Sequence, residues 1–415
     1  MTVRGTVPED LDRGVLTAPE EPVVQVAPTR APLTPGEWVR RNLFSNLWNS
    51  VLTVATGAFV LYVAFRLLRF VFVSADWTVF KANLRVYMTG RFPVEELWRV
   101  WAVVFLLAGL AGVSRGAFPS SRWSRRQRIL AVALAALAIG AVVYLVESSR
   151  VWLLLGIAAA VFSGTVAAGR RIGRRGRRGL LVAWILAFPA IVALLSVGDV
   201  KTAQWGGLLL NLIVAAVAIF VSFPIGLLLA LGRRSSLPVV SGFCVGFIEV
   251  VRGVPLVTLL IFGRFVLPLL LPPQLDLSQI MRAMFMITIF SSAYVAEIVR
   301  GGLQGVPEGQ YEAARALGLS TTRTMALVAL PQALRSTIPS MIGHFISVFK
   351  DTSLLAALDI FTDLLDTADR ASNDLRFVGH QAEALLPAAF FFWVIAFTMS
   401  RWSQRVERRL GVGER

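Results

Sequence analysis

Long runs of uncharged residues recur along this chain of 415 residues, and their length is the strongest constraint on its fold. Most of them approach the roughly 20 apolar residues that an α-helix needs to cross a bilayer. Backbone groups in lipid have no water to bind, so such runs form helices. The sequence therefore predicts an all-α, polytopic membrane protein of about ten transmembrane helices. The runs lie at 47–65, 100–113, 129–146, 151–168, 180–197, 206–231, 254–271, 283–296, 338–349 and 384–399.

The charge of the chain follows the pattern of membrane topology. A formal net charge of +16 would suit nucleic-acid binding, but the arginines gather in the loops between the apolar runs. Cytoplasmic loops of membrane proteins carry such an excess of Lys and Arg. We therefore expect no nucleic-acid partner, and we place the Arg-rich loops and both termini in the cytoplasm. The Arg-rich loops lie at 122–128, 170–178, 233–234 and 401–409.

Cysteine and histidine are nearly absent. The single Cys244 excludes an intrachain disulfide and a thiolate cluster. With only two histidines, His344 and His380, little remains for a metal site, and we expect none.

The composition predicts three parts. Residues 1–40 begin as a polar, Pro-rich stretch, which indicates a flexible cytoplasmic tail. Residues 41–203 are expected to hold about five spans with a structural or subunit-contact role, since they contain few intramembrane charges. Residues 204–408 are expected to hold five more, interrupted by polar side chains. Within the second part, the amphipathic stretch 74–99 is expected to lie at the membrane interface.

A short charged helix is expected at 308–318, between two apolar segments. Pro307 suits the first helical position, and Gly318 can adopt the left-handed conformation that ends a helix. Ser320 can then cap the next helix. A helix of this kind suits docking into a partner's groove, although an ordinary capped loop helix has the same pattern. For a docking helix, the expected apolar contacts are Tyr311, Ala314, Leu317 and Leu319, and the expected orienting charges are Glu312 and Arg315.

Glu249 and Arg252 are ionisable residues within an apolar stretch. If that span begins near Val239, they lie roughly 15–20 Å along it and one turn apart, so they can pair. Gly253 and Pro255 are expected to break the helix beside them, as in the substrate sites of transporters. The pair is either part of a substrate pathway, where it would bind the two charges of an amino acid, or a buried structural ion pair.

Other polar residues of the chain can likewise have a functional or a structural role. Lys350 and Asp351, late in the ninth run, either line the pathway or mark an interface. Glu297 and Arg300 are expected to anchor the loop that follows them. His344 is expected to be a hydrogen-bonded packing residue.

The sequence contains no Gly-x-x-x-x-Gly-Lys-[Ser/Thr] run to bind phosphates. Any ATP-driven work therefore needs a separate ATPase subunit. We also find no pattern of a nucleophile with its base, so the chain is not expected to be an enzyme.

Several motifs together resemble one transporter family. Glu312-Ala313-Ala314, followed by Gly318 and later by Leu330-Pro331, resembles the EAA motif of ABC-importer permeases, which forms the coupling helix that docks on the ATPase. The surrounding motifs resemble the polar amino-acid permeases of this superfamily, over residues 204–408. They are Arg233-Arg234-Ser235, 249–256, 293–302, 306–310, 330–335 and 350–354. The N-terminal half, including residues 92–99, resembles the M-type subunit of general L-amino-acid permeases. His344 departs from the family, which commonly has Asn there.

The resemblance implies a C-terminal core of five helices of the type I ABC-importer fold, in a bacterial inner membrane. It implies a pseudo-two-fold heterodimer with a second permease subunit, a pair of ATPase subunits and a periplasmic amino-acid-binding protein. ATP and Mg²⁺ would act in the ATPase, and this chain would hold no cofactor. The implied docking residues are Gln310, Tyr311, Glu312, Ala313, Ala314, Arg315, Leu317 and Gly318.

The main alternative is a self-contained, ion-coupled secondary transporter. Such a protein is expected to contain inverted repeats and intramembrane acids. We find no convincing repeat between residues 40–200 and 204–405, and membrane acids are few.

Overall fold

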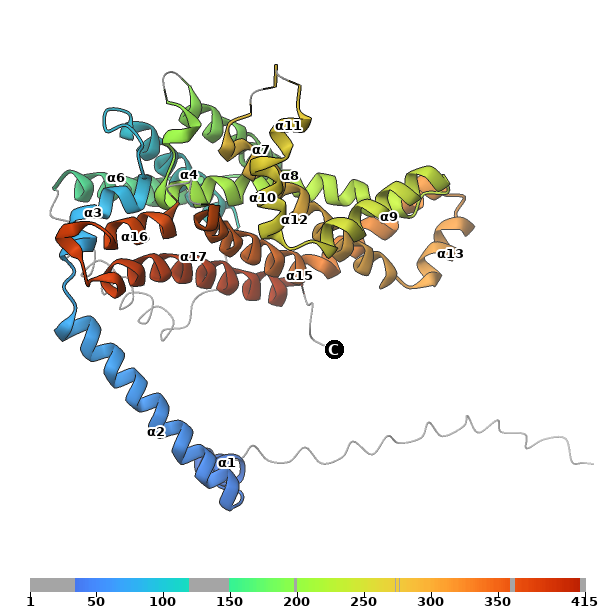
Figure 1. Ribbon diagram of the computed structural model, residues 1–415. Helices are drawn as coiled ribbons and strands as arrows, with labels where there is room; N and C mark the ends of the chain where they lie inside the picture. Colours follow the sequence, from blue (N-terminus) through green and yellow to red (C-terminus); the bar gives the residue numbers. More distant parts are fainter. Residues whose placement is uncertain are drawn as a thin grey trace, which may run out of the picture. The chain divides into compact units, whose positions relative to one another are not determined.

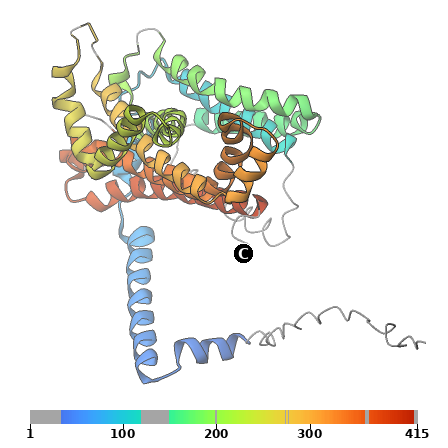
Figure 2. The same cartoon turned by 90° about the vertical axis from the view of Figure 1, so that its right-hand side faces the viewer.

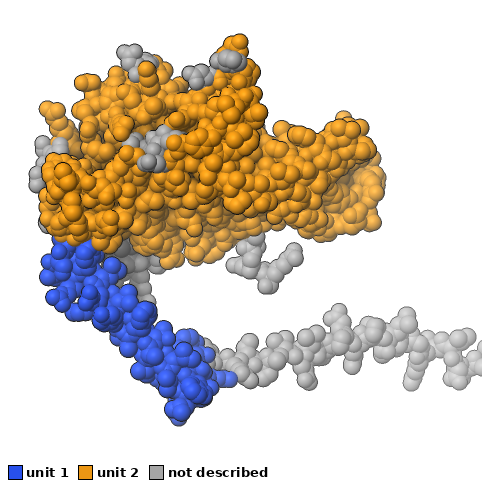
Figure 3. All heavy atoms as spheres, in the orientation of Figure 1, with its two compact units in different colours: residues 1–75 blue, residues 76–415 orange. Residues whose placement is uncertain are grey.

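The computed structural model describes residues 34–118, 149–197, 200–272, 274–275, 277–358 and 363–410. They are helical, with one isolated bridge between Gly207 and Asp363, which confirms the predicted all-α class. The chain forms two compact units, Met1–Ala75 and Asp76–Arg415 (Figure 3). This division follows packing, and the three-part organisation expected from composition stays a prediction.

The first unit contains two helices with side-chain caps. Helix α1 (Pro35–Leu43) begins at a capping box in which Thr34 and Glu37 bind each other's backbone. Helix α2 (Leu47–Arg69) begins at Asn46, whose side chain accepts from Asn49 N at 2.8 Å. It continues into η1 (Phe70–Ser74), so that Leu47–Ser74 is long and apolar enough to cross a membrane.

The second unit contains the remaining helices (Figure 1). In chain order these are α3 (Thr78–Thr89), α4 (Leu97–Ala117), α6 (Ser149–Gly169), α7 (Arg174–Ser196), η2 (Thr202–Gln204), α8 (Gly207–Arg233), α9 (Pro238–Gly253), α10 (Leu256–Phe265), α11 (Leu267–Leu270), α12 (Gln279–Gln304), α13 (Glu308–Ala316), α14 (Thr321–Thr324), η3 (Met325–Ala329), α15 (Leu330–Asp351), η4 (Thr352–Leu358), α16 (Leu364–Ser372), η5 (Leu375–Phe377) and α17 (Gln381–Leu410).

The helices agree with the predicted polytopic membrane protein. Among the described residues, 8 helices are long and apolar enough to span a bilayer, or up to 9 if the bent pair α9–α10 is one span. The expected span at 129–146 lies outside the described residues.

The predicted break in the seventh apolar run is confirmed. Helices α9 and α10 meet at an angle of 101°. Val254 between them is extended, with φ −102° and ψ 133°, because the ring of Pro255 disfavours a helical conformation in the residue before it.

Helix α12 is the centre of the core, since it packs against α8, α9, α10 and α15. It approaches α8 closely at Gly226, where an added Cβ would lie 2.6 Å from the Cβ of Val295. Such small residues let helix backbones approach in a membrane.

Helix α3 is packed against other helices of the protein, and the expected interfacial position of this stretch stays a prediction. Its Phe80 and Tyr87 are buried against α16 and α17, and the Tyr87 hydroxyl donates to Ala384 O at 2.9 Å. Gly90, with φ +62°, brings the next turn against the backbone of Gly206. The apolar face that we assigned to the membrane interface is therefore covered by other helices.

Helices α4 and α6 pack side by side, as both views show (Figure 1 and Figure 2). Gly116 makes this packing possible, because a Cβ there would lie 2.2 Å from Val166 O. We expect Gly116→Ala to destabilise the protein by about 1–3 kcal/mol, since backbone atoms cannot rotate away. Thermal unfolding in detergent measures the effect, with Gly164→Ala as a control because no atom lies within 4 Å of its added Cβ. Equal stability of the two variants would contradict this packing.

Candidate functional site

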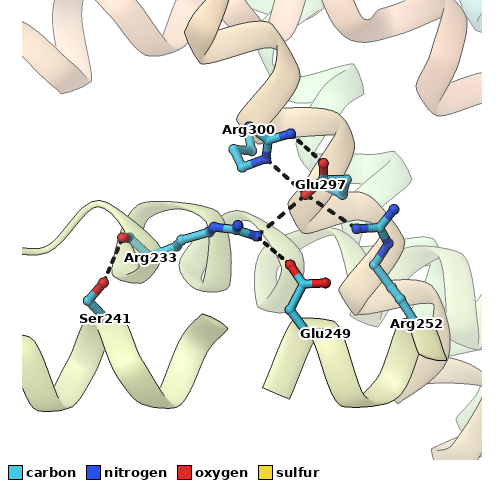
Figure 4. Close-up of polar contacts among 6 residues, drawn as sticks. All are labelled: Arg233, Ser241, Glu249, Arg252, Glu297 and Arg300. Carbon is cyan, nitrogen blue, oxygen red and sulfur yellow. Dashed lines mark hydrogen bonds and ion pairs between the residues drawn. The ribbon is translucent and has the colours of Figure 1, made fainter. Parts of the chain in front are cut away.

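Five charged residues from three helices form one ion-pair network, called here the charge network (Figure 4). Arg233 is the last residue of α8, and Glu249 and Arg252 lie in the last turns of α9. Glu297 and Arg300 come from the last two turns of α12. The network therefore joins the ends of α8, α9 and α12.

Glu297 is the centre of the charge network. One of its oxygens lies 3.6 Å from Arg233 Nη1 and 3.5 Å from Arg252 Nη1. Arg300, one turn further along α12, donates to the same carboxylate through Nε and Nη2. Arg233 Nη1 also lies 3.2 Å from Glu249 Oε1, which adds the second acidic residue.

The predicted pair between Glu249 and Arg252 is wrong, because each is paired with another helix. Their expected depth in the membrane stays a prediction. Helix α9 crosses the end of α8, where Ser241 Oγ donates to Arg233 O at 2.9 Å. Their position along α9 is therefore no measure of depth in the membrane. Glu297 and Arg300 were expected to anchor the adjacent loop. The structure shows Glu297 tying α12 to α8 and α9, with Arg300 bound to Glu297 on the same helix.

The charge network is partly buried. The exposed fractions of its side chains range from 24% for Glu297 to 55% for Glu249. Arg252 lies with its guanidinium carbon 5.6 Å from the ring centre of Tyr294, and its buried Nε has no hydrogen-bond partner among the described residues. These side chains are open enough to rearrange, since the charges of a fully buried pair would be costly to separate.

A series of contacts between polar side chains continues from Tyr294 into the core. The ring of Tyr294 stacks on His344 at 5.5 Å. His344 Nε2 lies 2.9 Å from Ser291 Oγ, which donates to Ser222 Oγ at 2.9 Å. The expectation that His344 is a hydrogen-bonded packing residue is confirmed.

The predicted charged helix is present as α13 and ends as expected. Gly318 has φ +75°, and Leu319 N donates to Ala314 O while Gly318 N donates to Arg315 O. These two bonds form a Schellman motif, which pairs carbonyls that a helix end leaves free. Ser320 then caps α14 by accepting from Arg323 N.

The faces of α13 differ from the expected ones. Ala314 is only 3% exposed, so the expectation that it contacts a partner is wrong. Tyr311 turns toward its own chain, where its hydroxyl donates to Leu303 O at 3.4 Å. Arg315, expected to orient a partner, pairs with Glu308 of the same helix at 3.3 Å.

The exposed face of α13 is the part open to a partner. Leu317, at its C-terminal end, is 81% exposed. The other exposed members of the predicted docking set are Gln310, Glu312, Ala313, Arg315 and Gly318.

Lys350 and Asp351 lie apart from the charge network. On α15, Ala333 lies against Gly302 of α12, and His344 bonds to Ser291. The two helices are thus antiparallel, and Lys350 is separated from the level of Glu297 by roughly 18 Å at 1.5 Å per residue. The four residues expected to line a substrate pathway therefore form two groups, one near each end of the core.

A buried cluster of hydrogen-bonded polar residues includes Thr352, which directly follows Lys350 and Asp351 in the sequence. Asn211 of α8 donates to Thr352 Oγ1 at 3.1 Å and to Asp363 Oδ2 at 3.2 Å, and it accepts from Leu364 N at 2.9 Å. Asp363 is the N-cap of α16 and accepts from Asp366 N at 3.0 Å. Burial raises the pKa of Asp363 to about 6, although these hydrogen bonds oppose the shift.

Stability is expected to depend on the protonation of Asp363. Its pKa is raised on folding, so its neutral form stabilises the fold below about pH 4, and this contribution is lost as the pH rises through about 6. The size is on the order of 2–3 kcal/mol. We expect Asp363→Asn to flatten the pH dependence of thermal unfolding between about pH 4 and 7. A variant with the same slope as the wild type would show that another group titrates.

Comparisons with known proteins identify the family. Residues 222–412 match the family described as "Binding-protein-dependent transport system inner membrane component". The chain is 36% identical, over 382 residues, to the inner membrane amino-acid ABC transporter permease protein YhdY of Escherichia coli K12. That alignment covers 91% of this chain and 93% of the relative. The chain belongs to the family of ABC transporter permeases.

Some other similar proteins match nearly the whole of this permease, and others match about half of it. BztC of Rhodobacter capsulatus, named as a glutamate/glutamine/aspartate/asparagine transport permease, is 34% identical over 93% of this chain and 96% of its own. GlnP of Bacillus subtilis, named as a probable glutamine ABC transporter permease, is 34% identical over 49% of this chain and 92% of its own. A crystal structure of an amino acid ABC transporter with histidines has 30% identity and a TM-score of 0.44, over 49% of this chain and 92% of that one.

Proposed function

We propose that this permease imports polar L-amino acids as the transmembrane subunit of an ATP-driven complex. The observation that carries the proposal is the match to YhdY and BztC, which extends over more than nine tenths of this chain. Both names describe amino-acid transport. The match includes the N-terminal helices as well as the core, so it concerns the permease as a whole.

The proposed complex has a second permease subunit, two ATPase subunits and an amino-acid-binding protein. The family description itself names dependence on a binding protein. ATP and Mg²⁺ act in the ATPase subunits, because this sequence lacks a phosphate-binding loop. The ATPase subunits dock on the exposed face of α13, and both termini lie on that cytoplasmic side, as the Arg-rich loops favour.

The proposed pathway runs through the core between the two polar groups. Glu249 and Arg252 lie near its cytoplasmic end, and Lys350 and Asp351 lie near its periplasmic end. Closure of the ATPase dimer moves α13, and the core then changes between inward and outward opening. In this account the two pairs of residues contact the amino acid one after the other, since they lie too far apart to bind one amino acid at the same time.

Uptake by the reconstituted complex tests this function. We expect proteoliposomes with ATP inside and binding protein outside to take up labelled glutamine or glutamate, and unlabelled polar amino acids to compete. Apolar amino acids serve as the control and are expected to compete weakly. ATP hydrolysis stimulated by the binding protein without uptake of any amino acid would contradict the proposed substrate class.

A further inference from the structure

Two consecutive arginines at the end of α8 contact different parts of the chain. Arg234 reaches α13, where its Nη1 donates to the Tyr311 hydroxyl at 3.4 Å. Its guanidinium carbon also lies 5.9 Å from the centre of the Tyr311 ring. Arg233 reaches the charge network instead. The end of α8 thus lies between the helix proposed to dock the ATPase and the ion pairs of α9 and α12.

The contacts in the charge network are of two kinds. Arg300 and Glu297 lie one turn apart on the same helix, so their contact survives movements between helices. Arg233–Glu249 and Arg252–Glu297 join different helices and are long, at 3.2 and 3.5 Å. Among the described residues, Arg233 is the only ion-pair partner of Glu249. A movement between α8 and α9 therefore acts first on Arg233.

Both halves of the broken span pack on α12, and α9 is held in addition by the end of α8. Helix α9 is attached to the end of α8 by Ser241 and Glu249, and Gly232 lets Cys244 approach closely. Helix α10 packs on α12, where Gly263 faces Met286. The bend at Gly253–Pro255 lies between these attachments. A shift at the end of α8 can therefore tilt α9 while α10 stays in place.

We propose that Arg233 is a positioning residue that transmits movement of α13, received through Arg234, to α9 and so to the pathway beside it. This inference rests on the proposed function. Helices α8, α9 and α12 are held together at this end by contacts that can separate, as two alternative arrangements require. The contribution of these contacts to stability is small, because partly exposed ion pairs typically contribute up to about 1 kcal/mol. Their main effect is therefore on coupling.

The test measures amino acids transported per ATP hydrolysed by the complete complex in proteoliposomes. We expect Arg233→Gln and Glu249→Gln each to lower this ratio about 5-fold or more, the lower range of typical coupling between sites. Since both variants break the same contact, the double variant is expected to resemble the single ones. Arg233→Lys keeps the charge and is expected to restore part of the ratio.

Arg376→Gln is the matched control. Arg376 pairs with Asp374 at 2.7 Å on the loop before α17, away from the charge network. Its loss removes an ion pair within one loop, which joins no two helices, and we expect an unchanged ratio. The control separates the specific position of Arg233 from the general effect of losing one charge.

Three results would overturn the proposal. The first is a ratio within about 2-fold of wild type for Arg233→Gln and Glu249→Gln, far below typical coupling. The second is additive effects of the two substitutions. The third is loss of complex assembly in Arg233→Gln with normal coupling in Glu249→Gln, which would assign Arg233 a structural role.

A wrong substrate class can be distinguished from a wrong role of Arg233. The ratio of ATP hydrolysis with and without the binding protein reports coupling even when the labelled amino acid is the wrong one. If wild-type complex transports no amino acid, but Arg233→Gln makes hydrolysis independent of the binding protein, the role of Arg233 stands and the substrate class is wrong. If ATP hydrolysis by the Arg233→Gln complex depended on the binding protein as in the wild type, the role of Arg233 would be overturned.

Discussion

Gly318→Val is expected to abolish ATP-driven transport by releasing the ATPase from α13. Gly318 has φ +75°, a conformation that costs other residues about 1–2 kcal/mol and a β-branched residue more. The strain acts on the helix end that presents Leu317, which is 81% exposed. Since 1.4 kcal/mol corresponds to a tenfold change in affinity, we expect the ATPase to bind at least roughly tenfold more weakly. Co-purification of the ATPase with the permease measures the loss.

Gly379→Val is the matched control for this experiment. Gly379 also has positive φ, at +94°, and no atom lies within 4 Å of an added Cβ at either glycine. It lies in the loop between η5 and α17, so the same strain acts elsewhere in the chain. We expect this variant to retain the ATPase. Equal retention by both variants would show that the end of α13 is not part of the docking surface.

Asn211→Leu is expected to have the largest effect on stability. Asn211 is fully buried and makes three hydrogen bonds, to Thr352, Asp363 and Leu364. Leucine has a similar volume but leaves the Leu364 N–H and the buried Asp363 carboxyl without this partner. We expect a loss of about 2–4 kcal/mol in the free energy of unfolding, because buried polar groups without partners are costly.

Thermal unfolding of the purified permease in detergent measures that loss. Asn373→Leu is the control, because Asn373 is exposed and, within the part of the chain that the structure describes, its side chain bonds only to Asp369 in its own turn. We expect a change of less than about 0.5 kcal/mol there. A small effect of Asn211→Leu would show that the buried group is satisfied in another way, by water for example.

Local backbone chemistry was predictable from the sequence. Pro255 breaks its helix and Gly318 ends another, because their conformational limits depend on the residue itself. Ser320 caps α14 for the same reason. The existence of α13 and its C-terminal end could therefore be derived before its surroundings were known, whereas Pro307, expected at the first helical position, is the N-cap residue.

Partners across helices were not predictable in the same way. The spacing of Glu249 and Arg252 predicts a pair on one helix, but each faces another helix, because the direction of α9 depends on the bend at Gly253–Pro255. Arg233 was interpreted only as a topological charge and motif residue, although it completes the charge network. Nothing in the local sequence of Arg233 distinguishes it from Arg234.

The amphipathic patterns did not show what covers the apolar face of a helix. Phe80 and Tyr87 of α3 form an apolar face that suits a membrane interface and a groove between helices equally well, and the structure has the groove. Tyr311 and Ala314 likewise share a face of α13, which turns toward the chain itself. A one-dimensional pattern shows which residues lie together on a helix, but not what covers them.

The energy source of transport is the most direct test of the central claim, that ATP hydrolysis in another chain moves the core through α13. Uptake is measured in proteoliposomes containing either the complete complex or this permease alone, with ATP or with an ion gradient. The account predicts uptake only for the complete complex with ATP, and its loss in Gly318→Val. Uptake by the permease alone under an ion gradient would contradict it.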